Sequence, residues 1–122
     1  MKTKPSVTKY SEVLSEYIEP LLVEEETEET YLSKARAGMI AWNYCVSLEN
    51  NLQGTSEMSE IIRNGFVQYP ESKVVLEFFI ERKKMHFAQY DQFIFDVRVN
   101  TKPDGTKTLY VESVPAAILD KA

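Results

Sequence analysis

The stretch LSKARAGMIAWNYCVSLENNL, from Leu32 to Leu52, decides the fold of this chain. Its polar residues return to one narrow stripe of a helix with 3.6 residues per turn: Arg36, Asn43, Ser47 and Asn50. The rest is mostly apolar, and so wide an apolar arc is typical of a helix with neighbours on several sides. Gly38 lies inside the arc, where the missing side chain lets another backbone come close. We therefore expect a central helix over about residues 28–51.

Length and composition indicate one small globular domain over residues 1–122. A chain of this length buries roughly two thirds of the surface that it exposes when unfolded. Residues 1–8 show no pattern and are expected to form a loose lead-in. The single cysteine, Cys45, rules out an internal disulfide and lies on the apolar arc, so we expect a core residue rather than a reactive thiol.

The charge distribution bears on the partner and the compartment. The net charge is −5, with five Lys/Arg and eleven Asp/Glu in residues 1–61 against nine and eight in residues 62–122. This sign makes nucleic acid or an anionic membrane an unlikely partner. The chain shows no signal peptide and no apolar run of the roughly 20 residues that span a bilayer. We therefore expect a soluble, cytoplasmic protein.

Three further helices are expected around the central one. Helical spacing runs from Tyr10 to Leu22, with an end or kink at Pro20. A third, shorter helix starts at Thr55 or Ser56 and stops at 64–65, after Gly54 has closed the central helix. The fourth covers about residues 71–88, and its broad apolar surface predicts burial on more than one side.

The acidic run EEETEE, residues 24–29, could suggest a metal or a basic partner. We favour a structural role, in which Thr27 caps the central helix and Glu28 and Glu29 face the positive end of its dipole. The remaining acids are then expected in a solvated loop.

The last third of the chain changes to the alternating pattern of β-strands. The segments QFIFDVRVN and KTLYVESV flank TKPDGT, in which Pro103 and Gly105 suit a type I turn followed by a bulge. We predict an antiparallel hairpin over about residues 92–100 and 106–114, with a short docked tail after it. Four helices followed by a C-terminal hairpin place the protein in the α+β class.

The turn also predicts the register of the hairpin. If Lys102 faces Thr106, then Val99 faces Leu109, and the alternation of side chains assigns the two faces. The expected core face comprises Phe93, Phe95, Val97, Val99, Leu109 and Val111. The expected outer face comprises Ile94, Asp96, Arg98, Asn100, Thr108, Tyr110, Glu112 and Val114.

This outer face holds the best polar cluster: Asp96, Arg98, Tyr110 and Glu112. Carboxylates that face each other across two strands could share a proton or a cation, which would make a ligand site. A neutralising Arg98 is the simpler explanation of the same pattern. Three other residues, Ile94, Tyr110 and Val114, make this face partly apolar and are the expected interface residues.

Other candidates for chemistry are weaker. His86, the only histidine, is expected at the core boundary of the fourth helix, and the cations of residues 82–84 point in different directions. No glycine-rich phosphate loop is present, and we expect no cofactor, no metal and no catalytic residue.

A two-stranded hairpin is marginal unless it packs on something or gains strands. We therefore expect a homodimer, or association with another protein, through the hairpin. The predicted function is a non-enzymatic interaction or regulatory module. The alternatives are a small-ligand binder or enzyme using the polar cluster, and nucleic-acid binding through residues 82–84.

Overall fold

The computed structural model describes residues 9–122, so the expected loose lead-in, residues 1–8, lies outside the described part. The helices are α1 (Tyr10–Ile18), α2 (Glu28–Asn50), α3 (Thr55–Gln68) and α4 (Glu71–His86). The strands are β1 (Gln92–Thr101) and β2 (Lys107–Pro115), and short 3-10 turns cover Glu19–Leu21 and Ala116–Ile118. This order confirms the predicted α+β class. Among the described residues, no helix combines the length and the apolar character needed to cross a membrane.

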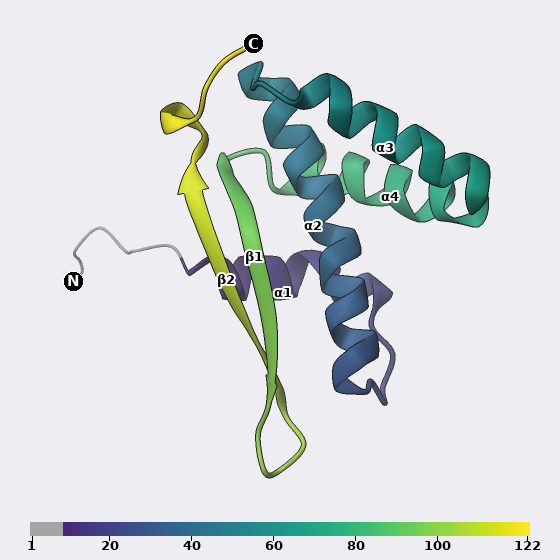
Figure 1. Ribbon diagram of the computed structural model, residues 1–122. Helices are drawn as coiled ribbons and strands as arrows, with labels where there is room; N and C mark the ends of the chain where they lie inside the picture. The colour runs from purple at the N-terminus through teal and green to yellow at the C-terminus, as the bar shows by residue number, and fades with distance from the viewer. Residues whose placement is uncertain (1–8) are drawn as a thin grey trace, which may run out of the picture.

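Helix α2 is the centre of the arrangement (Figure 1). It contacts β1 along one side, α4 on another, and also α1 and α3. Helix α1 crosses behind the hairpin, whereas α3 and α4 lie on the other side of α2 (Figure 1). The short tail after β2 is docked as expected, because the amide of Gln53, just after α2, donates to the carbonyl of Asp120 at 2.9 Å.

The N-terminus of α2 is capped as the sequence predicts. The Thr30 amide donates to Thr27 Oγ1, the Thr27 amide donates to Thr30 Oγ1, both at 3.0 Å, and Glu28 and Glu29 lie in the first turn. The C-terminus differs from expectation. Asn51, with φ 51°, takes the left-handed position that we assigned to Gly54, which instead precedes α3 with φ 86°.

An aromatic cluster fills the core between α1, α2 and α4. Trp42 and Tyr17 are fully buried, and their rings meet edge to face with centroids 5.2 Å apart. The Tyr17 hydroxyl donates to the carbonyl of Phe79, and burial raises the pKa of Tyr17. Further rings around this pair are Tyr10, Phe87 and Tyr90. Because each buried polar tip has a partner, the large rings can lie inside without an unpaired group.

The hairpin confirms the predicted turn and most of the predicted register. The Lys102 amide donates to the Thr106 carbonyl at 2.8 Å, and Gly105 has φ 91°. The pairs Val99–Leu109, Arg98–Tyr110 and Asp96–Glu112 all form.

One residue further along, a β-bulge changes the two faces. The register shifts between Ile94 and Asp96, so Ile94 pairs with Ser113, and Phe95 is the extra residue. Ile94 is 1% exposed and Phe95 is 55% exposed. The predicted placement of Ile94 on the outer face and of Phe95 in the core was therefore wrong.

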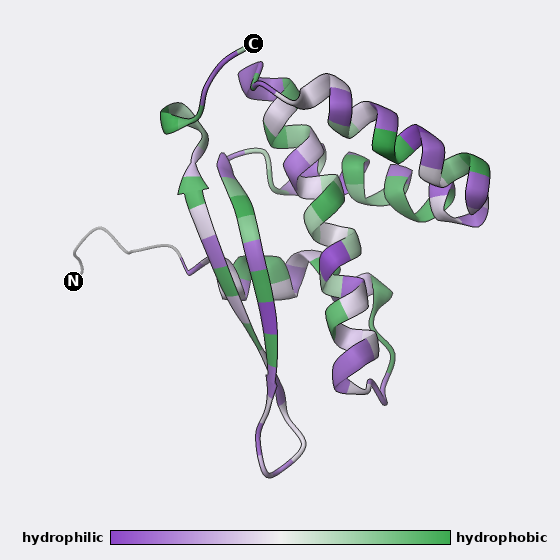
Figure 2. Ribbon diagram, viewed as in Figure 1, coloured by the Kyte–Doolittle hydropathy of each residue, from purple (hydrophilic) through white to green (hydrophobic). Residues whose placement is uncertain are grey.

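Helices α3 and α4 are less buried than their sequences indicate, and Figure 2 shows hydrophobic positions along both. From Thr55 to Gln68 no residue is fully buried, and α3 continues beyond the expected stop at 64–65. Along α4 only Phe79 and Lys83 are buried. Burial of α4 on more than one side was therefore a wrong prediction, since its exposed residues include Val74, Phe78 and Met85.

Two glycines allow a matched test of packing. A Cβ at Gly38 would collide with the side chain of Ile18, whereas Gly65 in α3 has open space around it. Gly38→Ala is expected to destabilise the fold by about 1–3 kcal/mol through overpacking. Gly65→Ala should instead stabilise it by about 0.5–1 kcal/mol, because alanine is the better helix former. Urea unfolding of both variants checks the pair, and an equal effect at the two sites would contradict it.

Candidate functional site

The predicted polar cluster exists on the outer face of the hairpin. Arg98 Nε lies 3.1 Å from Asp96 Oδ2, and Arg98 Nη2 lies 2.9 Å from Glu112 Oε1. Tyr110 pairs with Arg98 across the strands and is exposed. All four predicted residues therefore lie together, with Arg98 neutralising both carboxylates. The Arg98 side chain is 68% exposed, and ion pairs in such a setting contribute only about 0–1 kcal/mol.

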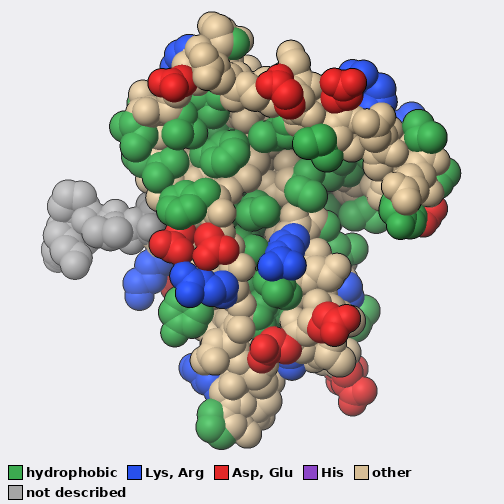
Figure 3. Space-filling view, in the orientation of Figure 1, with side chains coloured by type: hydrophobic (Ala, Val, Ile, Leu, Met, Phe, Trp, Pro, Cys, Tyr) green, Lys and Arg blue, Asp and Glu red, His purple; other side chains and the backbone are tan. Residues whose placement is uncertain are grey.

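An apolar surface lies beside this cluster. Phe93, Phe95, Val114 and Leu119, which we call the hairpin patch, line a hollow of about 480 Å³. Figure 3 shows hydrophobic side chains gathered over this part of the hairpin, next to acidic and basic ones. Val114 was expected on the surface, whereas Phe93 and Phe95 were assigned to the core. The bulge turns Phe95 outwards, whereas Phe93 is half-buried and still packs against the core, and no turn residue marks the position of the bulge in the sequence.

The two edges of the hairpin differ. Helix α2 covers the edge of β1, where Asn43 Nδ2 donates to the carbonyl of Ile94 at 2.6 Å and the Ile94 amide donates to Asn43 Oδ1 at 2.8 Å. Trp42 Nε1 donates to the carbonyl of Gln92 at 2.8 Å. Within residues 9–122, by contrast, no strand lies along the outer edge of β2. Sequence reasoning missed this role of Asn43, because its polar stripe was interpreted without a partner.

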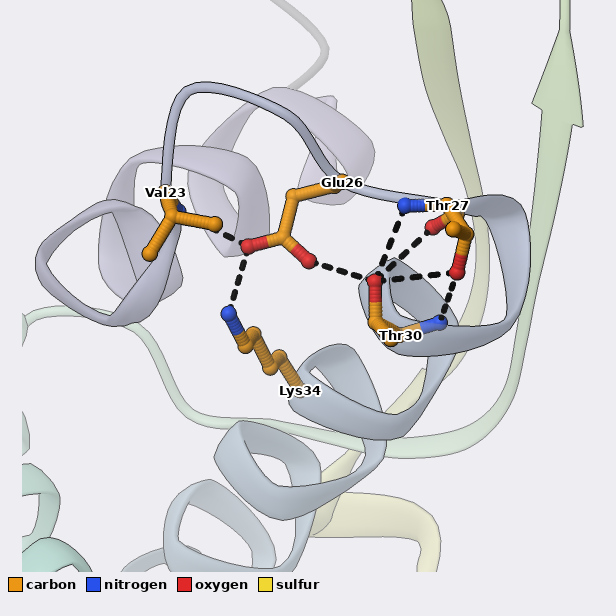
Figure 4. Close-up of polar contacts among 5 residues, drawn as sticks. All are labelled: Val23, Glu26, Thr27, Thr30 and Lys34. Atoms are coloured by element: carbon orange, nitrogen blue, oxygen red, sulfur yellow. Dashed lines mark hydrogen bonds and ion pairs between the residues drawn. The ribbon is translucent and has the colours of Figure 1, made fainter.

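Within the acidic run, the carboxylate of Glu26 is bound by a local network of hydrogen bonds (Figure 4). Lys34 Nζ donates to Glu26 Oε2 at 2.5 Å, Thr30 Oγ1 donates to Glu26 Oε1 at 2.6 Å, and the Val23 amide donates to Glu26 Oε2 at 2.7 Å. The hydrogen bond from Lys34, followed by those from Thr30 and Val23, lowers the pKa of Glu26 to about 2. The carboxylate therefore joins the loop to the start of α2, whereas we had expected Glu26 in a solvated loop.

Glu26→Gln is expected to lower the Tm by a few degrees at neutral pH. Because the folded-state pKa lies below the ordinary value of 4.5, the stabilisation is present above pH 4.5 and is lost as the pH falls towards 2. Melting curves at pH 7, 4 and 2 should show the wild type and the variant converging. Glu25→Gln, at the exposed neighbouring position, is the control. A Tm difference that stays constant with pH would contradict the assignment.

The cations of residues 82–84 do not form a common surface. Arg82 Nε donates to the carbonyl of Tyr17 at 3.0 Å, which caps the end of α1. Lys83 is fully buried and Nζ donates to the carbonyl of Tyr90 at 2.8 Å. The sequence spacing indicates different directions for the three cations, but it does not indicate that the Lys83 ammonium group lies inside the fold. Because Arg82 is half-buried against the end of α1 and Lys83 is buried, the three cations do not share one exposed surface.

The remaining chemical candidates do not join into a site. Burial raises the pKa of Cys45 to about 11, so its thiol is unreactive, as predicted. His86 is exposed, which corrects its expected place at the core boundary. Within residues 9–122, His, Cys, Asp and Glu form no group of three or more that could hold a metal.

The fold and this surface define an α+β protein with a short hairpin, in which α2 binds the start of β1 and, within residues 9–122, no strand lies along the outer edge of β2. No protein-family model matches the chain, and the searches of curated proteins and of solved structures found no similar protein.

Proposed function

We propose that this protein is a non-catalytic protein–protein interaction or regulatory module that self-associates through its C-terminal hairpin. The observation that carries this proposal is the hairpin patch. Phe95 is 55% exposed and lines a hollow with other apolar side chains and with Gln53 and Asp120. Tyr110, which lines a second hollow together with Phe95, is 61% exposed. Exposed apolar surface that is gathered in one place and bordered by charges is typical of protein interfaces.

Two of the expected interface residues keep their place in this proposal. Tyr110 is exposed, and Val114 lines the hollow of the hairpin patch. The side chain of Ile94, in β1, is buried and cannot contact a partner while the fold stays intact, so Phe95 replaces Ile94 in the proposed interface. We place the module in the cytoplasm, because its single cysteine is buried and unreactive, and proteins of oxidising compartments more often use disulfides.

The proposal is tested by the mass of the protein in solution. Light scattering at tens of micromolar is expected to give twice the chain mass of 14.1 kDa. Phe95→Asp should weaken association at least tenfold, whereas Val74→Asp, at an exposed apolar site on α4, should not. A monomeric wild type at these concentrations, or equal effects of both variants, would refute self-association through the hairpin.

A second candidate function is small-ligand binding, which a separate hollow favours. This hollow of about 540 Å³ is lined by two of the predicted polar residues, Tyr110 and Glu112, and by residues 9–11 of the chain. A ligand there would lose affinity with Glu112→Gln, and a thermal-shift screen of small cations and amines would find it. A screen without a Tm shift, on a protein that is dimeric by mass, would favour the interaction module.

A further inference from the structure

The structure assigns the self-association to one edge of the sheet. We infer that two copies pair antiparallel through the outer edges of β2, with Tyr110 facing the partner's Tyr110, to form a continuous four-stranded sheet. This inference rests on the proposed self-association and names its surface and its register.

The first argument is that part of the edge of β1 is already bound, whereas within the described residues no strand lies along the outer edge of β2. Asn43 and Trp42 already bind the edge of β1 at Ile94 and Gln92. An unpaired edge is a ready template for another strand, because its amide and carbonyl groups lack partners in the sheet. In the described part of the chain, the sheet has two strands and nothing continues it beyond β2.

The second argument is the direction of the backbone groups of β2. In an antiparallel ladder, every second pair of facing residues is hydrogen-bonded. Lys102–Thr106 is such a pair, so Asn100–Thr108 and Arg98–Tyr110 are hydrogen-bonded pairs as well. The amide and carbonyl groups of Tyr110 therefore point towards β1. Those of Leu109 and Val111 therefore point outwards, where an incoming strand would bind them.

The third argument is space beside the edge. The hollow of about 540 Å³ is lined by Tyr110 to Ser113 of β2, by Gln92 and Phe95 of β1, and by residues 9–11 at the start of α1. Neighbouring strands lie about 4.8 Å apart, so an incoming strand needs an open strip directly beside β2. At the middle of β2, Tyr110 is 61% exposed and the Glu112 side chain is 51% exposed, so this part of the strand is accessible to an incoming strand.

The fourth argument selects the register. Outward-pointing residues must face one another, so the two-fold axis passes through a residue near the middle of β2, namely Leu109, Tyr110 or Val111. With the axis at Tyr110, Leu109 faces the partner's Val111, and Thr108 faces the partner's Glu112. With the axis at Leu109, Lys107 would face an apolar residue, and with the axis at Val111, Tyr110 would face a carboxylate. Only the register at Tyr110 joins aromatic with aromatic and apolar with apolar.

The test uses the fact that a residue on a two-fold axis meets its own copy. Tyr110→Lys and Tyr110→Glu should each raise the dimer dissociation constant at least tenfold, because like charges then lie directly opposite each other. An equimolar mixture of the two variants should recover the dimer mass as a heterodimer. Glu77→Lys, on the exposed face of α4, is the matched control and should leave the dimer intact.

The outcomes separate this inference from the proposed function. A dimeric wild type whose Tyr110→Lys and Tyr110→Glu variants both stay dimeric would overturn the β2 edge and leave self-association standing. A monomeric wild type would contradict both the pairing through β2 and the proposed self-association. If circular dichroism shows that the charged variants are unfolded, disulfide cross-linking of Tyr110→Cys tests the inference instead.

Tyr110→Cys is the complementary variant. Residues opposite each other in a non-hydrogen-bonded antiparallel pair have Cα atoms about 4.5 Å apart, within the range that a disulfide spans. Mild oxidation should therefore convert most of the protein to a covalent dimer, while Asp104→Cys at the exposed turn should not cross-link efficiently. Cys45 does not interfere because it is buried. A dimer that fails to cross-link at position 110 would contradict the register.

Discussion

Asn43→Leu is expected to lower the free energy of unfolding by about 2–5 kcal/mol, although the two side chains have the same number of non-hydrogen atoms and branch at the same carbon. The carboxamide of Asn43 both donates to and accepts from the backbone of Ile94, with distances of 2.6 and 2.8 Å. Leucine would leave both backbone groups buried without these partners, and each such group costs about 1–3 kcal/mol. The loss falls next to the bulge, on the edge of β1 that faces α2 rather than β2.

The measurement is urea unfolding of the variant, together with hydrogen exchange of the Ile94 amide. The exchange of this amide should accelerate more than that of amides inside the ladder between β1 and β2. Asn50→Leu is the control, because Asn50 Nδ2 donates only to the carbonyl of Val46 in its own helix and is half-buried. We expect less than about 1 kcal/mol there. A similarly small effect of Asn43→Leu would mean that α2 does not hold the edge of β1.

The parts of the fold that the sequence predicts well depend on local physics. Thr27 and the two glutamates after it identify the start of α2, because a capping side chain and the helix dipole act within one turn. Pro103 and Gly105 determine the turn, and the turn sets the register as far as Asp96. The four polar residues of the outer face were therefore brought together correctly from sequence alone.

The parts that failed depend on contacts between distant segments. The bulge at Phe95 lies where Asn43, 51 residues earlier in the chain, binds Ile94. Alternation predicts the faces of a strand only while the pairing is regular, so Phe95 and Ile94 exchanged places. The hairpin patch, the core of our proposed function, was invisible in the sequence for this reason.

The burial of Lys83 is a second feature that the sequence did not predict, again because it depends on contacts between distant segments. A run of three cations on a helix normally indicates a solvated surface, since lysine is almost never fully buried unless it is paired. Here Lys83 points inwards, with Nζ 4.8 Å from the centroid of the Trp42 ring and 3.9 Å from Glu49 Oε1. Burial lowers the pKa of Lys83, and the carboxylate of Glu49 opposes that shift. Its partners come from α2 and from the segment before β1, and sequence spacing does not reveal them.

Lys83→Ala is therefore expected to destabilise the protein by about 3–5 kcal/mol, because it opens a cavity and removes the donor to the Tyr90 carbonyl. Lys83→Met, which keeps most of the volume, should lie within about 1.5 kcal/mol of the wild type, since losing a buried charge offsets the lost hydrogen bond. Lys84→Ala, at the exposed neighbouring position, should change the stability by less than about 0.5 kcal/mol. Urea unfolding of the three variants measures the order of their stabilities. Should methionine cost as much as alanine, the stabilisation would come from the ammonium group and its contacts with Trp42, Glu49 and Tyr90, and the packing explanation would be wrong.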